Sequence, residues 1–390
     1  MDYEINYFQG IVTLLRPLSS SARWDGVIAD GALAGNDLSL VAQYEYVPIN
    51  GAVAGEAFGG RAEAWVSDNV RLGLSAAHDG SGIADNEIAG LDVLVQQSES
   101  TNLKIDVAQS QGPGFGANNS INGGLDLDAD LTAGNAATAN AARIEAKADL
   151  AEISNGTLKG NIKAHYDQKD AGFVSADYNI KDKTRDYGAS GEVALGTRTA
   201  LTFSHLNATK GAATERTDSQ IGIKQAIGEQ VTLEAAVGTT NRVDPTGTAA
   251  ENGGRDELGF KLSYAQSDDL TLTAFGQATL STTGGLGENN RLGFGVETRL
   301  TEQLSLDGQV SDGNLGQAAS TTLRWDNGQG TSYRLGYELD PERRLGQTGL
   351  SGSDDGTIVI GADQKVNDQV TMRAENKLDM LGNRGSLTQS

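Results

Sequence analysis

Apolar and polar residues alternate along most of the chain from residue 36 onward, and this pattern constrains the fold more than any other feature. In residues 257–264, Leu258, Phe260, Leu262 and Tyr264 occupy every second position. Side chains of a β-strand point alternately to its two sides, so such a segment has one apolar face and one polar face. The alternation predicts an all-β protein.

The alternating segments and their connections predict how the strands are joined. Roughly twenty segments recur, most of them near the length of about 9–11 residues that a membrane-spanning β-strand needs. Tight turns alternate with longer connections, as in an antiparallel up-and-down barrel with short turns at one end and long loops at the other. The tight turns are expected at 228–229, 267–269, 301–302, 326–330 and 367–368, and the long loops at 240–255, 281–290, 312–317 and 340–356.

Alternation alone is also compatible with a soluble sandwich, whose apolar faces pack against each other. Two observations favour a transmembrane barrel. A two-sheet core built from so many strands would be unusually large for one domain, and an aromatic content of 5% is low for filling it. The sequence therefore predicts an antiparallel up-and-down transmembrane β-barrel of many strands. The alternative is a soluble or surface-displayed all-β adhesin or structural protein.

The polar face of the predicted barrel carries both signs of charge. Charges of this kind are costly against lipid but cost little in a water-filled lumen. The residues expected to face the lumen are Lys261, Arg291, Glu297, Arg299, Arg334, Glu338, Arg373, Glu375 and Lys377. The apolar face has aromatic residues close to tight turns, where a membrane interface would lie. These interface aromatics are Tyr264, Trp325 and Tyr333, whereas the parity of Trp65 puts it on the polar face.

The composition limits the classes of partner that the protein is expected to bind. The formal net charge is −22, which disfavours nucleic acid because phosphates are bound by basic patches. The chain has no Cys and hence no disulfide or thiolate site. Outer-membrane lipid is the expected partner, with divalent cations as further candidates at acidic loops such as 351–356, and the oligomeric state stays open.

Few residues suggest site chemistry. Asp126, Asp128 and Asp130 share one face of a possible strand and are weak candidates for a Ca²⁺ site, although the spacing is not that of an EF-hand. A solvated face explains them more simply. The three His residues are far apart in sequence and have no metal-ligand spacing. No enzymatic activity and no cofactor are expected.

The N-terminal residues DYEINYFQGI, at positions 2–11, resemble the Y-x-I-D-Y-x-x-G stretch of very large bacterial outer-membrane β-proteins, with Asn6 in place of the usual Asp. Residues 44–48 and 101–112 look similar to strands that follow that module. The resemblance implies an N-terminal β module or lead-in strand pair in residues 1–30, a porin-like or receptor-like barrel in residues 31–390, and a location in the bacterial outer membrane. It also implies a pore or scaffold for transport or secretion. The acidic start and Ser390 at the end, where an aromatic residue is usual, suggest a fragment.

Overall fold

The structure is a computed structural model of the 390-residue chain. It describes residues 3–6, 11–14, 27–29, 56–80, 85–112, 117–119, 128–130, 138–175, 178, 180–245, 247, 249, 252–339, 356–365, 371–379 and 385–389. Within these residues the chain is almost entirely antiparallel β-sheet, as the alternation predicts.

The strands fall into one large sheet and two small pairs. The pairs are β1 (Tyr3–Asn6) with β2 (Ile11–Leu14), and β7 (Ala117–Asn119) with β8 (Asp128–Asp130). The first half of the large sheet contains β3 (Ala57–Ser67), β4 (Val70–Asp79), β5 (Asn86–Gln96), β6 (Asn102–Gln111), β9 (Ala139–Asp149), β10 (Gly160–Lys169), β11 (Thr184–Ala194), β12 (Thr199–Lys210), β13 (Thr214–Ile227) and β14 (Val231–Val243). The second half contains β15 (Gly253–Ser267), β16 (Leu270–Gly284), β17 (Arg291–Arg299), β18 (Leu304–Gly313), β19 (Ala318–Asp326), β20 (Thr331–Leu339), β21 (Thr357–Lys365), β22 (Thr371–Asp379) and β23 (Gly385–Gln389).

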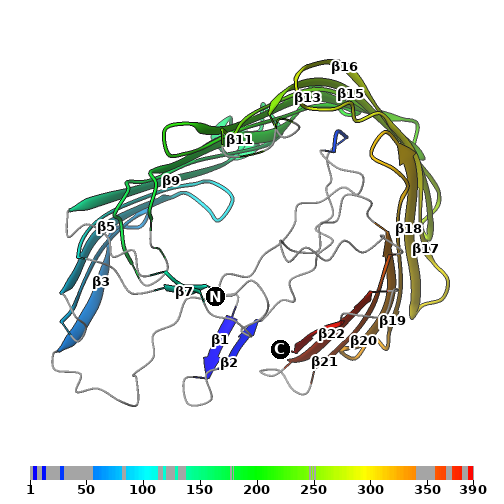
Figure 1. The fold of residues 1–390 in the computed structure, drawn as a ribbon. Coiled ribbons are helices and arrows are strands. Elements are labelled where there is room, and N and C mark those ends of the chain that lie inside the picture. Colours follow the sequence, from blue (N-terminus) through cyan, green and yellow to red (C-terminus); the bar gives the residue numbers. More distant parts are fainter. Residues whose placement is uncertain are drawn as a thin grey trace.

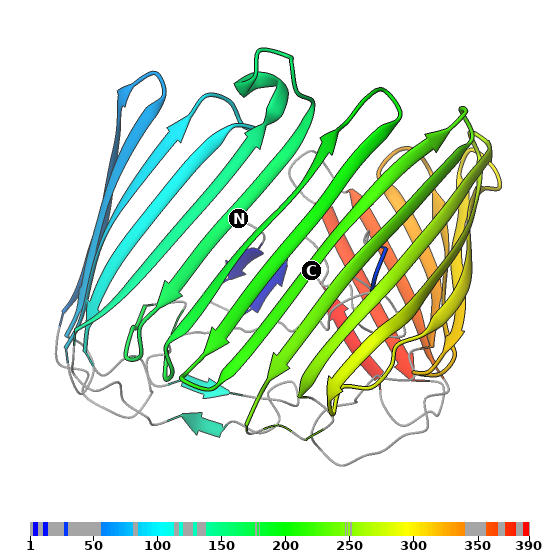
Figure 2. The same ribbon diagram turned by 90° about the horizontal axis from the view of Figure 1, so that it is seen from above.

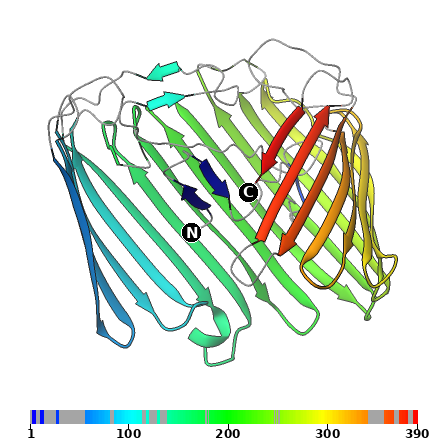
Figure 3. The ribbon, with the colours of Figure 1, turned by 90° about the horizontal axis from the view of Figure 1, so that it is seen from below.

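The large sheet has the strand order of a closed up-and-down barrel. From β3 to β23 each strand pairs with the next along the chain, except that β6 pairs directly with β9 and leaves β7 and β8 outside the wall. The predicted fold class is therefore confirmed. Figure 1 shows the sheet curving around an interior, with β1 and β2 on its concave side. These two strands also lie within the outline of the barrel from above and below (Figures 2 and 3).

The two ends of the barrel differ in their connections, as the sequence predicts. At the turn end, strands are joined by short connections such as 228–230, 268–269 and 300–303. At the loop end, connections such as 285–290 are longer, and the β7–β8 pair lies there (Figure 2).

Some predicted boundaries are wrong. The loop predicted at 281–290 is shorter, because Ser281 and Thr282 continue β16 by pairing with Asp256 and Arg255 of β15. The loop predicted at 240–255 is shorter, because Thr240 and Arg242 continue β14 by pairing with Arg255 and Gly253 of β15. The strict alternation of 143–150 ends in a helical turn, α1 (Leu150–Ile153), because the Asp149 side chain accepts hydrogen bonds from Ala151 N and Glu152 N and caps that turn. Among the described residues, no helix has the length and apolar character needed to cross a bilayer.

The strand β15 shows how exposure follows the alternation. From Arg255 to Ala265 every odd-numbered residue is buried or half-buried, whereas every even-numbered residue is exposed. The exposed set includes Leu258, Phe260 and Leu262, each more than 40% accessible. Many large apolar side chains of the other described strands are likewise exposed rather than packed into the core of a sandwich.

A glycine at the start of β15 provides a test of this wall. Gly253 has φ of +141°, and a Cβ there would lie 2.0 Å from the Thr283 carbonyl oxygen. We expect Gly253→Ala to lower the free energy of unfolding by about 1–3 kcal/mol, because backbone strain and a steric clash combine. The measurement is chemical denaturation followed by Trp fluorescence.

Gly295→Ala is the matched control, since no heavy atom lies closer than 3.5 Å to a Cβ at that position. Equal unfolding midpoints for the two variants would show that the β15–β16 pairing is not as close as described.

Candidate functional site

The register of the strands defines two faces of the wall. Gly259 pairs with Gln277 of β16, and its missing Cβ leaves room for Ile28. The segment 27–29, drawn in blue, lies on the concave side of the sheet (Figure 1). The face that carries Gly259 and Gln277 is named here the inner face. The opposite face, which carries Leu258, Phe260 and Leu262, is the outer face.

The outer face is a continuous apolar surface that runs across the strands. Its exposed members come from both halves of the sheet and share the parity of Leu258 in the register of the ladders. They include Leu72, Leu74, Leu91, Val107, Ile144, Ile221, Ile223, Leu233, Val237, Leu272, Leu292, Phe294, Val310, Leu323, Leu335 and Ile360. A surface of this extent indicates a partner that is itself apolar.

The inner face is polar and its charges are largely paired. Lys261 Nζ lies 3.6 Å from Glu234 Oε1 on the neighbouring strand. Near the other edge of the first half, Arg61 Nη2 lies 2.7 Å from Asp92 Oδ1. Asp92 is only 4% exposed, and it occupies the space that a side chain at Gly73 would fill. The inner face therefore carries fixed pairs of charges rather than a single sign.

The register places the predicted lumen charges on this same face. Arg291 lies 5.2 Å from the centre of the Phe275 ring, Arg299 lies 3.4 Å from Asp269 at the turn end, and Arg334 lies 3.4 Å from Asp363. Glu297 is directly opposite Asp307, and Glu338 is opposite Ser320. On β22, Arg373, Glu375 and Lys377 occupy register positions opposite Asp363, Gly361 and Val359. That these residues line a water-filled lumen stays a prediction.

The predicted interface aromatics lie on the outer face near the turn end. Trp325 and Tyr333 are directly opposite each other across β19 and β20, with stacked rings 5.7 Å apart. Tyr264 is exposed beside the irregularity that precedes the 268–269 turn. Trp65 pairs with Arg71 in the register and so lies on the inner face.

Two further tyrosines, which the sequence interpretation missed, lie on the outer face toward the loop end. Tyr166 and Tyr187 are directly opposite each other on β10 and β11. The signal for Tyr166 is the parity that it shares with Ile162 in the segment 160–169, where the alternation is less strict than elsewhere. The two tyrosines mark the point where the outer face changes from apolar to polar residues.

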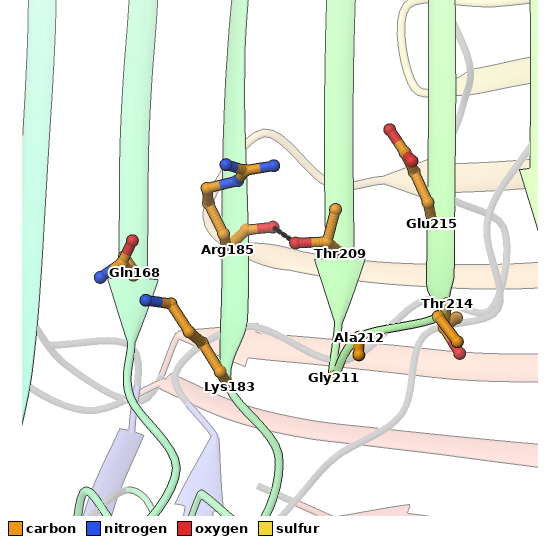
Figure 4. A pocket seen from close by; sticks show the side chains of 9 residues that line it. Gln168, Lys183, Arg185, Thr209, Gly211, Ala212, Thr214 and Glu215 are labelled. Atoms are coloured by element: carbon orange, nitrogen blue, oxygen red, sulfur yellow. Dashed lines mark hydrogen bonds between the residues drawn. The ribbon is translucent and has the colours of Figure 1, made fainter.

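Beyond these tyrosines a cavity of about 360 Å³ opens at the loop end (Figure 4). Its lining includes Gln168, Lys183, Arg185 and Glu215. Thr209 Oγ1 donates a hydrogen bond of 3.4 Å to the Arg185 carbonyl oxygen, and Lys183 Nζ lies 3.1 Å from Asp170 Oδ1. Two basic side chains and one acidic side chain thus line this cavity.

The acidic cluster predicted as a weak metal candidate is not tested. Asp126 lies outside the described residues, and Asp128 and Asp130 are placed on β8. Within the part of the chain that the structure describes, no group of three or more His, Asp or Glu is arranged to hold a metal ion.

A deeply buried pair of charges lies on the inner face of β15. Glu257 is 2% exposed, and its Oε1 lies 2.9 Å from Arg255 Nε. The same oxygen accepts a hydrogen bond of 2.5 Å from Gln277 Nε2, while Arg255 Nη1 donates one of 3.2 Å to the Gly287 carbonyl. This pair links two strands to the 285–290 connection.

Comparisons with known proteins give structural matches only. Neither a family model nor a curated protein matches the chain. Solved structures similar to it include the siderophore receptor PirA from Pseudomonas aeruginosa, with 11% identity and a TM-score of 0.44, covering 86% of this chain and 69% of that one. The ferric-catecholate import receptor Fiu from E. coli has 9% identity and a TM-score of 0.42, covering 87% and 72%. The ferric enterobactin receptor PfeA of P. aeruginosa, in a double-mutant form, has 11% identity and a TM-score of 0.39, and this chain covers 64% of its length.

The buried pair generates a prediction about stability. We expect Glu257→Leu to destabilise the fold by about 3–5 kcal/mol, because Arg255 would stay buried without its counter-charge. The double variant Arg255→Leu with Glu257→Leu should recover much of that loss. Lys261→Met, which breaks a more exposed pair on the same face, should cost at most about 1 kcal/mol.

The unfolding midpoints of the parent protein, the two single variants and the double variant measure these differences in stability. If Glu257→Leu and Lys261→Met had equal effects, the burial of the Arg255–Glu257 pair would not govern its energetic role.

Proposed function

We propose that this chain is an integral outer-membrane β-barrel that acts as a pore for transport or secretion. The observation that carries the proposal is the inversion of the wall, with exposed apolar side chains on the outer face and paired charges on the inner face. Lipid is the apolar partner that fits an outer face of this extent. In a bilayer, a strand can satisfy its main-chain polar groups only by pairing with neighbours, which a barrel provides.

The distribution of aromatic residues supports the same orientation. Trp325 and Tyr333 near the turn end, and Tyr166 and Tyr187 toward the loop end, would lie at the two membrane interfaces, where amphipathic rings are favoured. Between these levels the outer face carries the apolar residues Leu258, Phe260 and Leu262 on β15. The turn end would then face the periplasm and the loop end the exterior.

The proposal is tested with the purified chain reconstituted in lipid vesicles and planar bilayers. We expect the protein to require detergent in solution, to resist carbonate extraction from vesicles and to give discrete conductance steps. A soluble monomer in plain buffer would contradict the membrane assignment and favour an adhesin or structural role. Stable insertion without conductance would instead favour a scaffold over a pore.

Charge placement on β15 provides a prediction that separates the two faces. We expect Phe260→Arg on the outer face to disfavour folding into bilayers by about 2–4 kcal/mol, the cost of an arginine near the membrane midplane. Ser263→Arg on the inner face of the same strand is the control and should cost much less. Folded fractions in vesicles as a function of urea measure both; similar losses for the two variants would refute the assignment of the outer face to lipid.

A further inference from the structure

A tripeptide far from the barrel strands in sequence is seated against the inner face. Ile28 and Ala29 are 8% and 5% exposed. The Ala29 N–H donates to Gln277 Oε1 at 2.9 Å, and Gln277 Nε2 donates back to the Ala29 carbonyl at 2.9 Å. Asn289 Nδ2 donates to the same carbonyl at 2.8 Å. Two side chains of the wall thus bind the main chain of Ala29 as a neighbouring strand would.

The wall is hollowed where Ile28 lies. A Cβ at Gly259 would be 2.8 Å from Ile28 Cγ1 and 3.0 Å from the Val27 carbonyl oxygen. A Cβ at Gly238 would be 3.0 Å from Ile28 Cδ1. Real Cβ atoms rarely come this close to other atoms, so the two glycines create the space that Ile28 fills.

The side chains that bind Ala29 are oriented by further hydrogen bonds within the wall. Gln277 Nε2 also donates to Glu257, whose partner Arg255 is fixed by the Gly287 carbonyl. The Asn289 N–H donates to Thr279 Oγ1 at 2.8 Å, and the Asn289 side chain is 1% exposed. The amide of Gln277 is therefore oriented with its oxygen toward the Ala29 N–H. Gln277, Asn289, Glu257, Arg255, Gly238 and Gly259 are named here the clasp.

We propose that the clasp is an autoinhibitory latch, which holds Val27–Ala29 against the inner face, keeps the β1–β2 pair on the concave side of the barrel, and keeps the pore closed or narrowed until Val27–Ala29 is released. This inference rests on the proposed pore function. The position of β1 and β2 on the concave side supports it, because these strands precede the tripeptide in the chain (Figures 1 and 3). Recognition through one short stretch of main chain is also suited to release, since among the described residues it involves the three hydrogen bonds of Ala29 and the apolar side chains of Val27 and Ile28.

The seating of the tripeptide is tested by thiol labelling, which does not depend on pore activity. The chain has no Cys, so Ala29→Cys introduces a single thiol and keeps the main-chain hydrogen bonds. In the reconstituted barrel we expect slow reaction with a water-soluble maleimide. Gln277→Leu, which removes both reciprocal hydrogen bonds, and Gly259→Ala, which fills the hollow, should each speed labelling at least tenfold.

Matched controls lie on the same face. Gln309→Leu on β18 and Gly295→Ala on β17 make the same changes at inner-face positions outside the clasp, and they should leave labelling unchanged. If Gln277→Leu fails to fold, Gly259→Ala retains every polar group of the clasp and decides the result.

Single-channel conductance of the same proteins tests the gate. The latch predicts larger or more frequent openings in Gln277→Leu and Gly259→Ala than in the parent and the controls. Unchanged labelling would overturn the seating, and faster labelling with unchanged conductance in a conducting barrel would overturn the gate. If every protein inserts and none conducts, the proposed pore function and the gate fall together, whereas labelling still shows whether the tripeptide is held.

Discussion

Antiparallel main-chain pairing around the barrel is the interaction on which the rest of the structure depends. From β3 to β23 each strand is hydrogen-bonded to its neighbours in the ring. Main-chain polar groups that are paired in this way do not need water, so one face of the sheet can carry apolar side chains without leaving polar groups exposed to an apolar partner. The side-chain arrangement of the wall follows from this pairing.

The apolar outer face and polar inner face determine which groups are buried in the interior of the barrel. Polar and charged groups are buried there beside apolar ones such as Ile28 and Ala29, and burial of charge is tolerated only with compensating partners. Arg255 with Glu257, and Arg61 with Asp92, meet this condition by pairing within the sheet. The clasp meets the same condition in another way. The buried side-chain amides of Gln277 and Asn289 are paired because they form hydrogen bonds with the main chain of Ala29.

The wall could be predicted from the sequence because alternation is a local signal. The parity of Leu258, Phe260 and Leu262 predicts the exposed outer face, and the turns at 228–230 and 268–269 fall where the sequence predicts them. The ends of strands were harder to predict. Thr240 and Arg242 resemble loop residues in composition but pair with β15. Leu150 keeps the alternation, yet the cap formed by Asp149 turns it into α1.

The clasp could not be predicted, for a physical reason. Its hydrogen bonds join Ala29 to Gln277 and Asn289, residues separated by 248 and 260 positions, and they use side chains on one partner and main chain on the other. Such contacts impose no period on either segment. Gly238 and Gly259 have the composition of any barrel wall, and only the closeness of Ile28 gives them a role.

The most direct test of the account is a labelling scan along β15 in vesicles. Single Cys residues at positions 260 to 264 of the naturally Cys-free chain would carry an environment-sensitive fluorophore. Even positions should report an apolar environment and be quenched from lipid tails, whereas odd positions should be quenched by aqueous iodide, giving a period of two. Loss of this alternation, with iodide reaching every position equally, would contradict an outer face in lipid and an inner face in water.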